Sequence, residues 1–147
     1  MTDPLPVITD HAAATGFLDA RIGRGVKPGL ERITGLLDFM ADPHLNYPII
    51  HVAGTNGKTT VTRLVSDILG AHGLITGTFI SPHLHRVEER FSVGGSPLTE
   101  DGFVDLVAEN AWIVEEYERR HTEGVTYFEV TAALAFATFA QAAVDVV

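Results

Sequence analysis

The residues best suited to chemistry lie in one short stretch, residues 51–60, which reads His-Val-Ala-Gly-Thr-Asn-Gly-Lys-Thr-Thr. Gly54 and Gly57 have no Cβ, so the backbone around them can approach a ligand closely. Lys58 can place a positive charge on the outer phosphates of a nucleotide, and a hydroxyl that follows it can bind Mg²⁺. The stretch therefore predicts a loop that binds a triphosphate.

Seven residues of this loop are the expected nucleotide contacts: Gly54, Thr55, Asn56, Gly57, Lys58, Thr59 and Thr60. The common phosphate loop has a further glycine where this chain has Val52, so the pattern is the shortened form Gly-x-x-Gly-Lys-Thr. Lys58 is the expected catalytic residue, because it can neutralise charge that develops during phosphoryl transfer. Thr59 is the expected metal ligand of the loop, and Thr60 is the alternative.

A strand and a helix must hold this loop in place. The near-continuous apolar run from Tyr47 to Val52 predicts a buried parallel strand before it. Apolar residues recur at helical spacing after it, which predicts an amphipathic helix over Val61 to Leu69. The N–H groups and the dipole at the start of that helix favour an anion. The expected buried residues of this helix are Val61, Leu64, Val65, Ile68 and Leu69.

A second group of polar residues follows the next expected strand, Leu74 to Ile80. In parallel sheets, ligands bind at the carboxyl ends of the strands, so this loop and the phosphate loop should lie at one edge. Ser81 can bind a cation there, and Arg86 and Arg90 can hold an anionic substrate. The competing interpretation is an ordinary surface loop, whose arginines pair with the two glutamates between them.

Glu129 is the third candidate, at the start of an alanine-rich helix expected over Phe128 to Ala142. A carboxylate at a helix N-terminus is stabilised by the helix dipole, and that effect alone can explain the residue. A hard oxygen ligand near a triphosphate can also hold Mg²⁺. The sequence leaves both interpretations open.

Composition excludes several other classes of protein. The chain has 147 residues, enough for one domain, and 46% of them are hydrophobic, as expected for a globular fold. Ten basic residues against 19 acidic ones give a net charge of −9, which argues against a nucleic-acid binder. The absence of cysteine excludes disulfides and Cys-ligated zinc. Since no signal peptide or membrane-spanning run is visible, the expected location is the cytoplasm.

The remaining sequence predicts three more helices and a hairpin. Asp10 should cap a helix from His11 to about Ile22, and a second helix should cover Leu30 to Met40. Residues 91–98 form an expected hairpin with a glycine turn. A long helix from Thr99 to about Arg120 is expected to bury Phe103, Leu106, Val107, Ala111, Val114 and Tyr117 and to expose Glu115, Glu116, Glu118, Arg119 and Arg120.

The order of these elements predicts an α/β domain with a P-loop-type, mainly parallel sheet and flanking helices. The last four residues, Val144 to Val147, look like the start of a further strand, so we expect an incomplete domain. Because such a sheet has an open edge, we expect the chain alone to be poorly stable and to bind a nucleotide weakly.

The loop His51-Val52-Ala53-Gly54-Thr55-Asn56-Gly57-Lys58 resembles the nucleotide loop of the Mur ligase superfamily, whose own form is the shortened one. Three more stretches in the same register resemble its folylpolyglutamate synthase/dihydrofolate synthase branch: Gly29-Leu30-Glu31-Arg32-Ile33, Ser81-Pro82-His83-Leu84 with Glu89-Arg90, and Thr126-Tyr127-Phe128-Glu129-Val130. Residues 1–15 are expected to be an N-terminal arm and helix start. The resemblance runs over residues 16–147 and implies the N-terminal part of a Mur-ligase-type ATP-binding domain there.

The resemblance further implies an ATP-dependent ligase, which activates a folate or dihydropteroate carboxylate as an acyl phosphate and joins it to L-glutamate. The implied cofactors are ATP and Mg²⁺, with Ser81, Glu129 and Thr59 as metal ligands. The carboxylate substrate is expected against Pro82, His83, Leu84, Arg86 and Arg90. We expect the complete enzyme to be a monomer and this chain alone to be inactive. Whether the enzyme adds the first glutamate, later ones or both stays open.

Two alternative functions fit the same residues. The folate branch usually has glycine after the loop lysine, whereas this chain has Thr59-Thr60, as in Mur ligases that act on nucleotide-linked peptidoglycan precursors. Such ligases usually carry a separate substrate domain before the loop, and only 53 residues precede Gly54. The second alternative is a nucleotide-binding module with no ligase activity.

Overall fold

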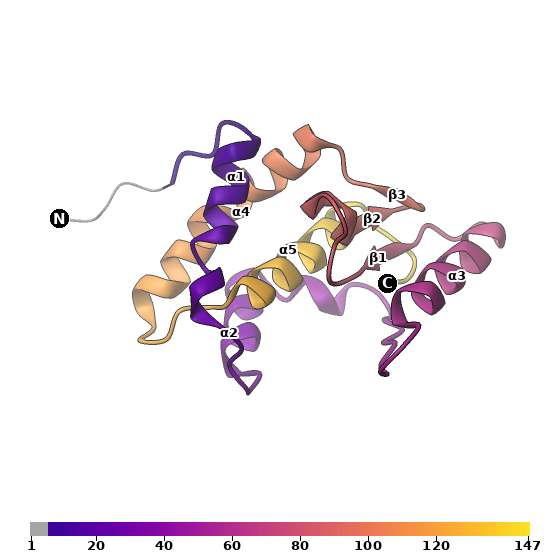
Figure 1. Cartoon of the computed structure of the whole chain (residues 1–147), viewed down its shortest axis with the longest axis horizontal. Coiled ribbons are helices and arrows are strands. Elements are labelled where there is room, and N and C mark those ends of the chain that lie inside the picture. The colour runs from indigo at the N-terminus through magenta and orange to yellow at the C-terminus, as the bar shows by residue number, and fades with distance from the viewer. Residues whose placement is uncertain (1–5) are drawn as a thin grey trace. The chain divides into compact units, whose positions relative to one another are not determined.

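The structure is a computed structural model that describes residues 6–147, in which the chain divides into two compact units (Figure 1). The helical unit contains the described residues up to Asp42 together with Glu100–Leu134. The sheet unit contains Pro43–Thr99 and Ala135–Val147. The first five residues of the expected N-terminal arm lie outside the described residues. No helix among residues 6–147 is long and apolar enough to cross a membrane.

The helical unit is built from helices at the positions that the sequence predicts. They are α1 (His11–Asp19), the short η1 (Ile22–Arg24), α2 (Glu31–Phe39), α4 (Glu100–Arg120) and the first half of α5 (Tyr127–Gln141). Asp10 caps α1 as predicted, because its Oδ1 accepts a hydrogen bond of 2.8 Å from the N–H of Ala13. The cap satisfies an N–H group that has no partner within the helix.

The core of the helical unit follows the helical period of its sequence. All six residues predicted for the buried face of α4 are buried: Phe103, Leu106, Val107, Ala111, Val114 and Tyr117. Buried apolar residues of α1 and α2 belong to the same unit: Ala14, Phe17, Leu18, Leu36 and Leu37. Spacing of three and four residues places each set on one face of its helix. Packing of these faces buries their apolar surface, which stabilises the unit.

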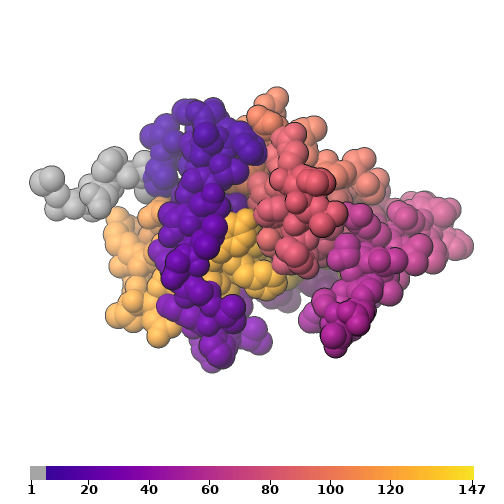
Figure 2. Space-filling view, in the orientation of Figure 1, coloured from indigo at the N-terminus to yellow at the C-terminus, as the bar shows by residue number. Residues whose placement is uncertain are grey.

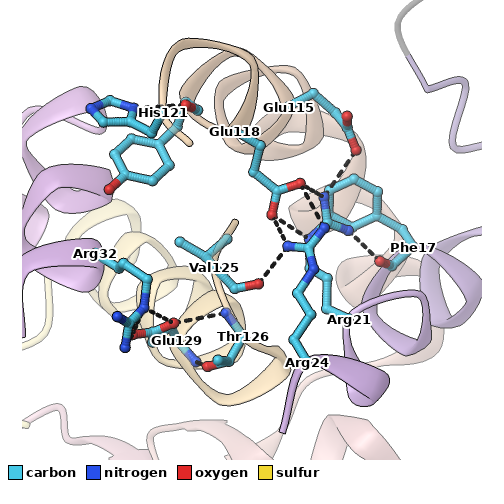
Figure 3. Close-up of polar contacts among 11 residues, drawn as sticks. Phe17, Arg21, Arg24, Arg32, Glu115, Glu118, His121, Val125, Thr126 and Glu129 are labelled. Carbon is cyan, nitrogen blue, oxygen red and sulfur yellow. Dashed lines mark hydrogen bonds and ion pairs between the residues drawn. The ribbon is translucent and has the colours of Figure 1, made fainter. Parts of the chain in front are cut away.

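The solvated face expected for α4 is partly wrong, because the side chains of Glu116 and Glu118 are only 15% and 13% exposed. The side chain of Glu118 lies between two arginines (Figure 3). Arg21 Nη2 lies 3.1 Å from its Oε2, and Arg24 Nη2 donates to the same oxygen over 3.2 Å. Burial raises the pKa of this carboxyl, but hydrogen bonds from Arg24 and Arg21 outweigh burial and lower the pKa overall. Glu118 therefore joins the segments around η1 to α4.

The sheet unit contains a small antiparallel sheet with one helix beside it. Its elements are η2 (Pro43–Leu45), α3 (Lys58–Ala71), β1 (Gly77–Phe79), η3 (Val87–Arg90), β2 (Phe91–Val93), β3 (Ser96–Pro97) and the second half of α5. The strand order is β1-β2-β3, with Phe79 opposite Phe91 and Ser92 opposite Pro97. The hairpin expected over residues 91–98 is confirmed.

Parallel pairing is less extensive than the sequence predicts. Residue Thr76 pairs with Val146 in a single parallel bridge. The N–H of Ile50 donates to Val147 O over 2.7 Å, and the N–H of Val147 donates to Pro48 O over 3.0 Å. These two bonds align residues 48–50 with the end of the chain, but they are too few to make a regular strand of Tyr47–Val52. The fold is α/β, as expected, while its named strands pair antiparallel.

The predicted burial of α3 is also largely wrong. Val61, Leu64 and Ile68 are 46%, 55% and 59% exposed, because this helix faces only the short segments of a narrow sheet. Figure 2 shows α3 and the loop before it at the surface of the molecule. The buried residue of α3 is Ser66, whose Oγ lies 2.7 Å from Thr76 Oγ1. This hydroxyl pair joins α3 to the segment that enters β1.

Candidate functional site

The phosphate loop is exposed and has the backbone shape that its glycines allow. Residues 53–58 are all exposed to solvent. Gly54 has φ of 149° and Gly57 has φ of 76°, both in the range that side chains disfavour. Among the described residues, no heavy atom outside the glycine and its two chain neighbours lies within 4 Å of the position that a Cβ would take at Gly54 or Gly57. The space beside the loop is therefore open to a ligand.

Lys58 and the start of α3 face this open loop. Gly57 is the N-cap of α3 and has no side chain to cap it, so the first N–H groups of the helix keep their capacity for an anion. Lys58 Nζ donates to Gly54 O over 2.7 Å and to Thr55 O over 3.3 Å. The ammonium group therefore lies across the loop. Thr59 is half-buried, whereas Thr60 is exposed.

In the second predicted loop, Arg90 is turned inward. Arg90 is only 7% exposed. Arg90 Nη1 donates to Ser81 Oγ over 3.1 Å, and its Nε donates to His83 Nδ1 over 2.8 Å. The guanidinium thus holds the first residues of the loop in place. Contact of Arg90 with a substrate stays a prediction.

The two glutamates of this loop have different partners. Glu89 accepts hydrogen bonds from the N–H groups of Leu84, His85 and Arg86, at 2.8, 3.0 and 3.0 Å. These bonds, with that from Leu84 contributing most, lower the pKa of Glu89. Glu88 Oε1 lies 3.2 Å from Arg86 Nη2. One arginine therefore pairs with a glutamate, as the surface-loop interpretation expects, while Glu89 shapes the backbone.

The phosphate loop and the loop after β1 follow two segments that both run parallel to the end of the chain. Residues 48–50 and the segment entering β1 both align in parallel with the end of the chain, residues 145–147. The phosphate loop follows residues 48–50, and Ser81 follows β1. Parallel segments place their carboxyl ends together, as was predicted for these two loops. Pro82 follows Ser81 through a cis peptide bond, and Leu84 is 79% exposed.

Glu129 lies in the helical unit, where its carboxylate already has partners (Figure 3). It is 8% exposed and is hydrogen-bonded to Arg32 and to the N–H of Thr126. In return, the N–H of Glu129 donates to Thr126 Oγ1 over 3.2 Å, so the two residues form a capping box, for which Thr-x-x-Glu is the sequence signal. Nothing local in the sequence links Glu129 to Arg32, since the two lie 97 residues apart. Metal binding by Glu129 stays a prediction.

No protein-family model matches the chain. It is 40% identical to a dihydrofolate synthase/folylpolyglutamate synthase of Mycobacterium tuberculosis over 128 residues, which are 82% of this chain and 26% of that protein. A structure of Mycobacterium tuberculosis folylpolyglutamate synthase complexed with ADP matches with a TM-score of 0.85 and 38% identity, over 93% of this chain and 32% of that one. An FPGS–AMPPCP–folate complex matches with a TM-score of 0.84 and 28% identity, over 94% and 34%.

These likenesses confirm the family resemblance and the α/β fold class. The sequence similarity covers 82% of this chain, and the structural similarity covers 93% of it. The chain spans between a quarter and a third of the length of these relatives.

Proposed function

Because this chain is homologous to part of the folylpolyglutamate synthase/dihydrofolate synthase branch of the Mur ligase superfamily, we propose that it forms the ATP–Mg²⁺ part of a folate ligase. The whole reaction joins L-glutamate to a folate or dihydropteroate carboxylate. The observation that carries this proposal is the exposed glycine loop at the uncapped start of α3, with Lys58 lying across it. Solved relatives in complex with ADP, and with AMPPCP and folate, support it.

The chemistry requires that negative charge be held in place during phosphoryl transfer. The substrate carboxylate attacks the γ-phosphorus of ATP, which gives an acyl phosphate and ADP; the glutamate amine then displaces phosphate to form the amide. We assign Lys58 and the backbone N–H groups at the start of α3 to the phosphate oxygens, where charge develops. The residues of the loop are therefore placed to bind and to orient the triphosphate rather than to react with it.

The oxygen atoms of the two loops fit Mg²⁺. This ion commonly takes one or two protein ligands, while phosphates and water complete its six oxygen neighbours. We propose the hydroxyls of Thr59 and Ser81 as its protein ligands; when bound, the ion neutralises charge on the phosphates. Among the described residues, no three His, Asp or Glu side chains gather to form a metal site by themselves. Glu129 is hydrogen-bonded to Arg32 and Thr126, as Ser81 is to Arg90, and its role as a third ligand stays a prediction.

The loop Pro82–Arg90 is our candidate border for the carboxylate substrate, through Pro82, His83, Leu84 and Arg86, with the buried Arg90 holding the loop from within. Homology to the folate branch favours this substrate class over a peptidoglycan precursor, despite Thr59-Thr60. We also propose a cytoplasmic location and a monomeric complete enzyme.

Binding experiments on the chain distinguish the substrate classes. We would titrate the chain with dihydropteroate, with folate and with a nucleotide-linked muramyl peptide, each in the presence of Mg²⁺ and AMPPCP. The proposal predicts binding of the pteridine compounds and none of the muramyl peptide. Binding of the muramyl peptide alone would assign the chain to the cell-wall ligases, and binding of AMPPCP without either substrate would favour a nucleotide-binding module.

A further inference from the structure

His83 accepts a hydrogen bond from a group that can only donate. Arg90 Nε lies 2.8 Å from His83 Nδ1. A guanidinium has N–H donors and no acceptor, so Nδ1 must present its lone pair to Arg90. When one nitrogen of a neutral imidazole accepts, the other carries the hydrogen. His83 is therefore held as the tautomer with its hydrogen on Nε2.

The Nε2–H group of His83 is available to a ligand. His83 is half-buried, and within residues 6–147 its ring makes no hydrogen bond other than the one to Arg90. Its Nε2 is not enclosed by the described part of the chain, so this nitrogen is open to solvent. A ligand that lies against the loop can therefore accept from it without displacing a protein partner.

Two adjacent residues fix the backbone on both sides of His83. Arg90 Nη1 donates to Ser81 Oγ over 3.1 Å, two residues before the histidine. Glu89 accepts from the N–H groups of residues 84–86, which are three successive donors of the kind that surround an anion. The direction of the Nε2–H group is thus set before a ligand binds, which lowers the entropic cost of using it.

A histidine held in this way has a narrow chemical role. While Arg90 occupies Nδ1 and Nε2 carries hydrogen, neither nitrogen can take a proton or bind a metal ion. The ring can only donate from Nε2, and it does so as a neutral group. Such a donor selects an acceptor atom, such as a carbonyl oxygen or an unprotonated ring nitrogen, and a pteridine ring has both.

We propose that His83 is a specificity-determining residue, which donates a hydrogen bond from Nε2 to an acceptor atom of the pteridine ring, and that Arg90 is the positioning residue that fixes this tautomer. The donor claim rests on the proposed function, since it requires that the loop border a pteridine compound. The tautomer claim stands on the contact between Arg90 and His83 alone.

Two substitutions at His83 separate the roles of its two nitrogens. The amide of asparagine overlaps Nδ1, so His83→Asn can still accept from Arg90 but has lost the Nε2–H donor. The longer glutamine overlaps Nε2, so His83→Gln keeps a donor there but has lost the contact with Arg90. His85→Asn is the matched control, because His85 is an exposed histidine of the same loop and contacts Glu89 through its backbone N–H.

Each form of the chain is titrated with dihydropteroate in the presence of Mg²⁺ and AMPPCP, and its unfolding midpoint is recorded. We expect His83→Asn to weaken dihydropteroate binding by about 10-fold, as for one lost hydrogen bond, with a midpoint within about 1 °C of the parent. His83→Gln should bind within about three-fold of the parent and unfold roughly 5 °C lower. His85→Asn should change neither quantity. Parent-like binding by His83→Asn, or equal losses of affinity in both His83 variants, would overturn the donor claim.

Nitrogen NMR of the parent chain tests both claims without a substitution. At neutral pH we expect the ring hydrogen of His83 on Nε2 alone. Its signal should shift as dihydropteroate is added, whereas that of His85 should not. A hydrogen on Nδ1 would overturn the tautomer claim, and an unchanged Nε2 signal at saturation would overturn the donor claim.

Failure of the proposed function gives a different result. If the parent chain binds no pteridine compound, the substrate assignment is refuted and the donor claim falls with it, while the spectrum of the ligand-free chain still decides the tautomer. If the parent and His83→Asn bind dihydropteroate equally well, the proposed function holds and the donor claim fails.

Discussion

The guanidinium of Arg90 donates from Nη1 to Ser81 Oγ over 3.1 Å and from Nε to His83 Nδ1 over 2.8 Å. A single buried cation therefore fixes the hydroxyl that we assign to Mg²⁺ and the histidine two residues later. The relationship assigns Arg90 to holding the loop in shape. Contact with the substrate from this loop then falls to its exposed residues, such as Arg86, whose side chain is 56% exposed.

Replacing Arg90 should destabilise the sheet unit more than replacing Arg86. We expect Arg90→Gln to lower the free energy of unfolding by roughly 2 kcal/mol, because two hydrogen bonds from a buried charged group are lost. Arg86→Gln should change it by about 0.5 kcal/mol or less, as is usual for an exposed ion pair. Urea unfolding followed by circular dichroism measures both. Equal effects of the two changes would mean that Arg90 does not hold the loop.

Gly57 should tolerate no side chain without strain. Its φ of 76° is unfavourable for alanine, so Gly57→Ala should cost about 1 kcal/mol of stability. The same change should weaken AMPPCP binding, because the strain is relieved by moving the loop. Gly70→Ala is the matched control: Gly70 lies within α3 and its added Cβ would meet nothing within 4 Å in the described chain. Gly70→Ala should raise the free energy of unfolding by roughly 0.5–1 kcal/mol. If Gly70→Ala instead lowers stability as much as Gly57→Ala does, the positive φ of Gly57 is not the cause of the loss.

Glu118 should make stability depend on pH in the acid range. Its pKa in the folded chain is lower than the ordinary 4.5, so its contribution is complete at pH values above 4.5 and is lost as the pH falls through the folded value. Glu118→Gln should cost roughly 3 kcal/mol at pH 7, because two arginines lose their buried partner. In this variant, the decrease in stability between pH 5 and lower pH should be smaller than in the parent.

The control for this pH dependence is Glu115→Gln. Glu115 also pairs with Arg21, but its side chain is 41% exposed, so its removal should change stability little at any pH. Unfolding free energies measured across this range by urea titration test both variants. If the unfolding free energies of the parent and of Glu118→Gln fall in parallel as the pH is lowered, then Glu118 has the same pKa in the folded and unfolded chains, and the explanation is wrong.

Local periodicity predicted most of the helical unit, and it did so for a physical reason. The spacing of Phe103, Leu106 and Val107 determines one face of α4 wherever the helix packs, so their burial follows from the sequence. The same argument failed for Leu64 and Ile68 in α3, because burial also needs a neighbour, and the narrow sheet covers little of that helix.

Interactions between distant residues could not be predicted from local patterns. Arg32 and Glu129 lie 97 residues apart, and Arg24 and Glu118 lie 94 apart. The charge of each residue indicates that it is polar, but not which residue it contacts. The partners come together only when the helical unit folds. The phosphate loop was easier to predict, because its glycines, lysine and hydroxyls act within one turn of chain.

The central claim is that the loop before α3 binds the triphosphate of ATP with Mg²⁺, and calorimetric titration of the chain with AMPPCP tests it most directly. We predict binding that is weak, strengthened by Mg²⁺ and weakened by about 10-fold or more in Lys58→Ala, because a charged contact to phosphate is lost. Absence of binding to the parent chain, or equal binding to the parent and to Lys58→Ala, would contradict the account.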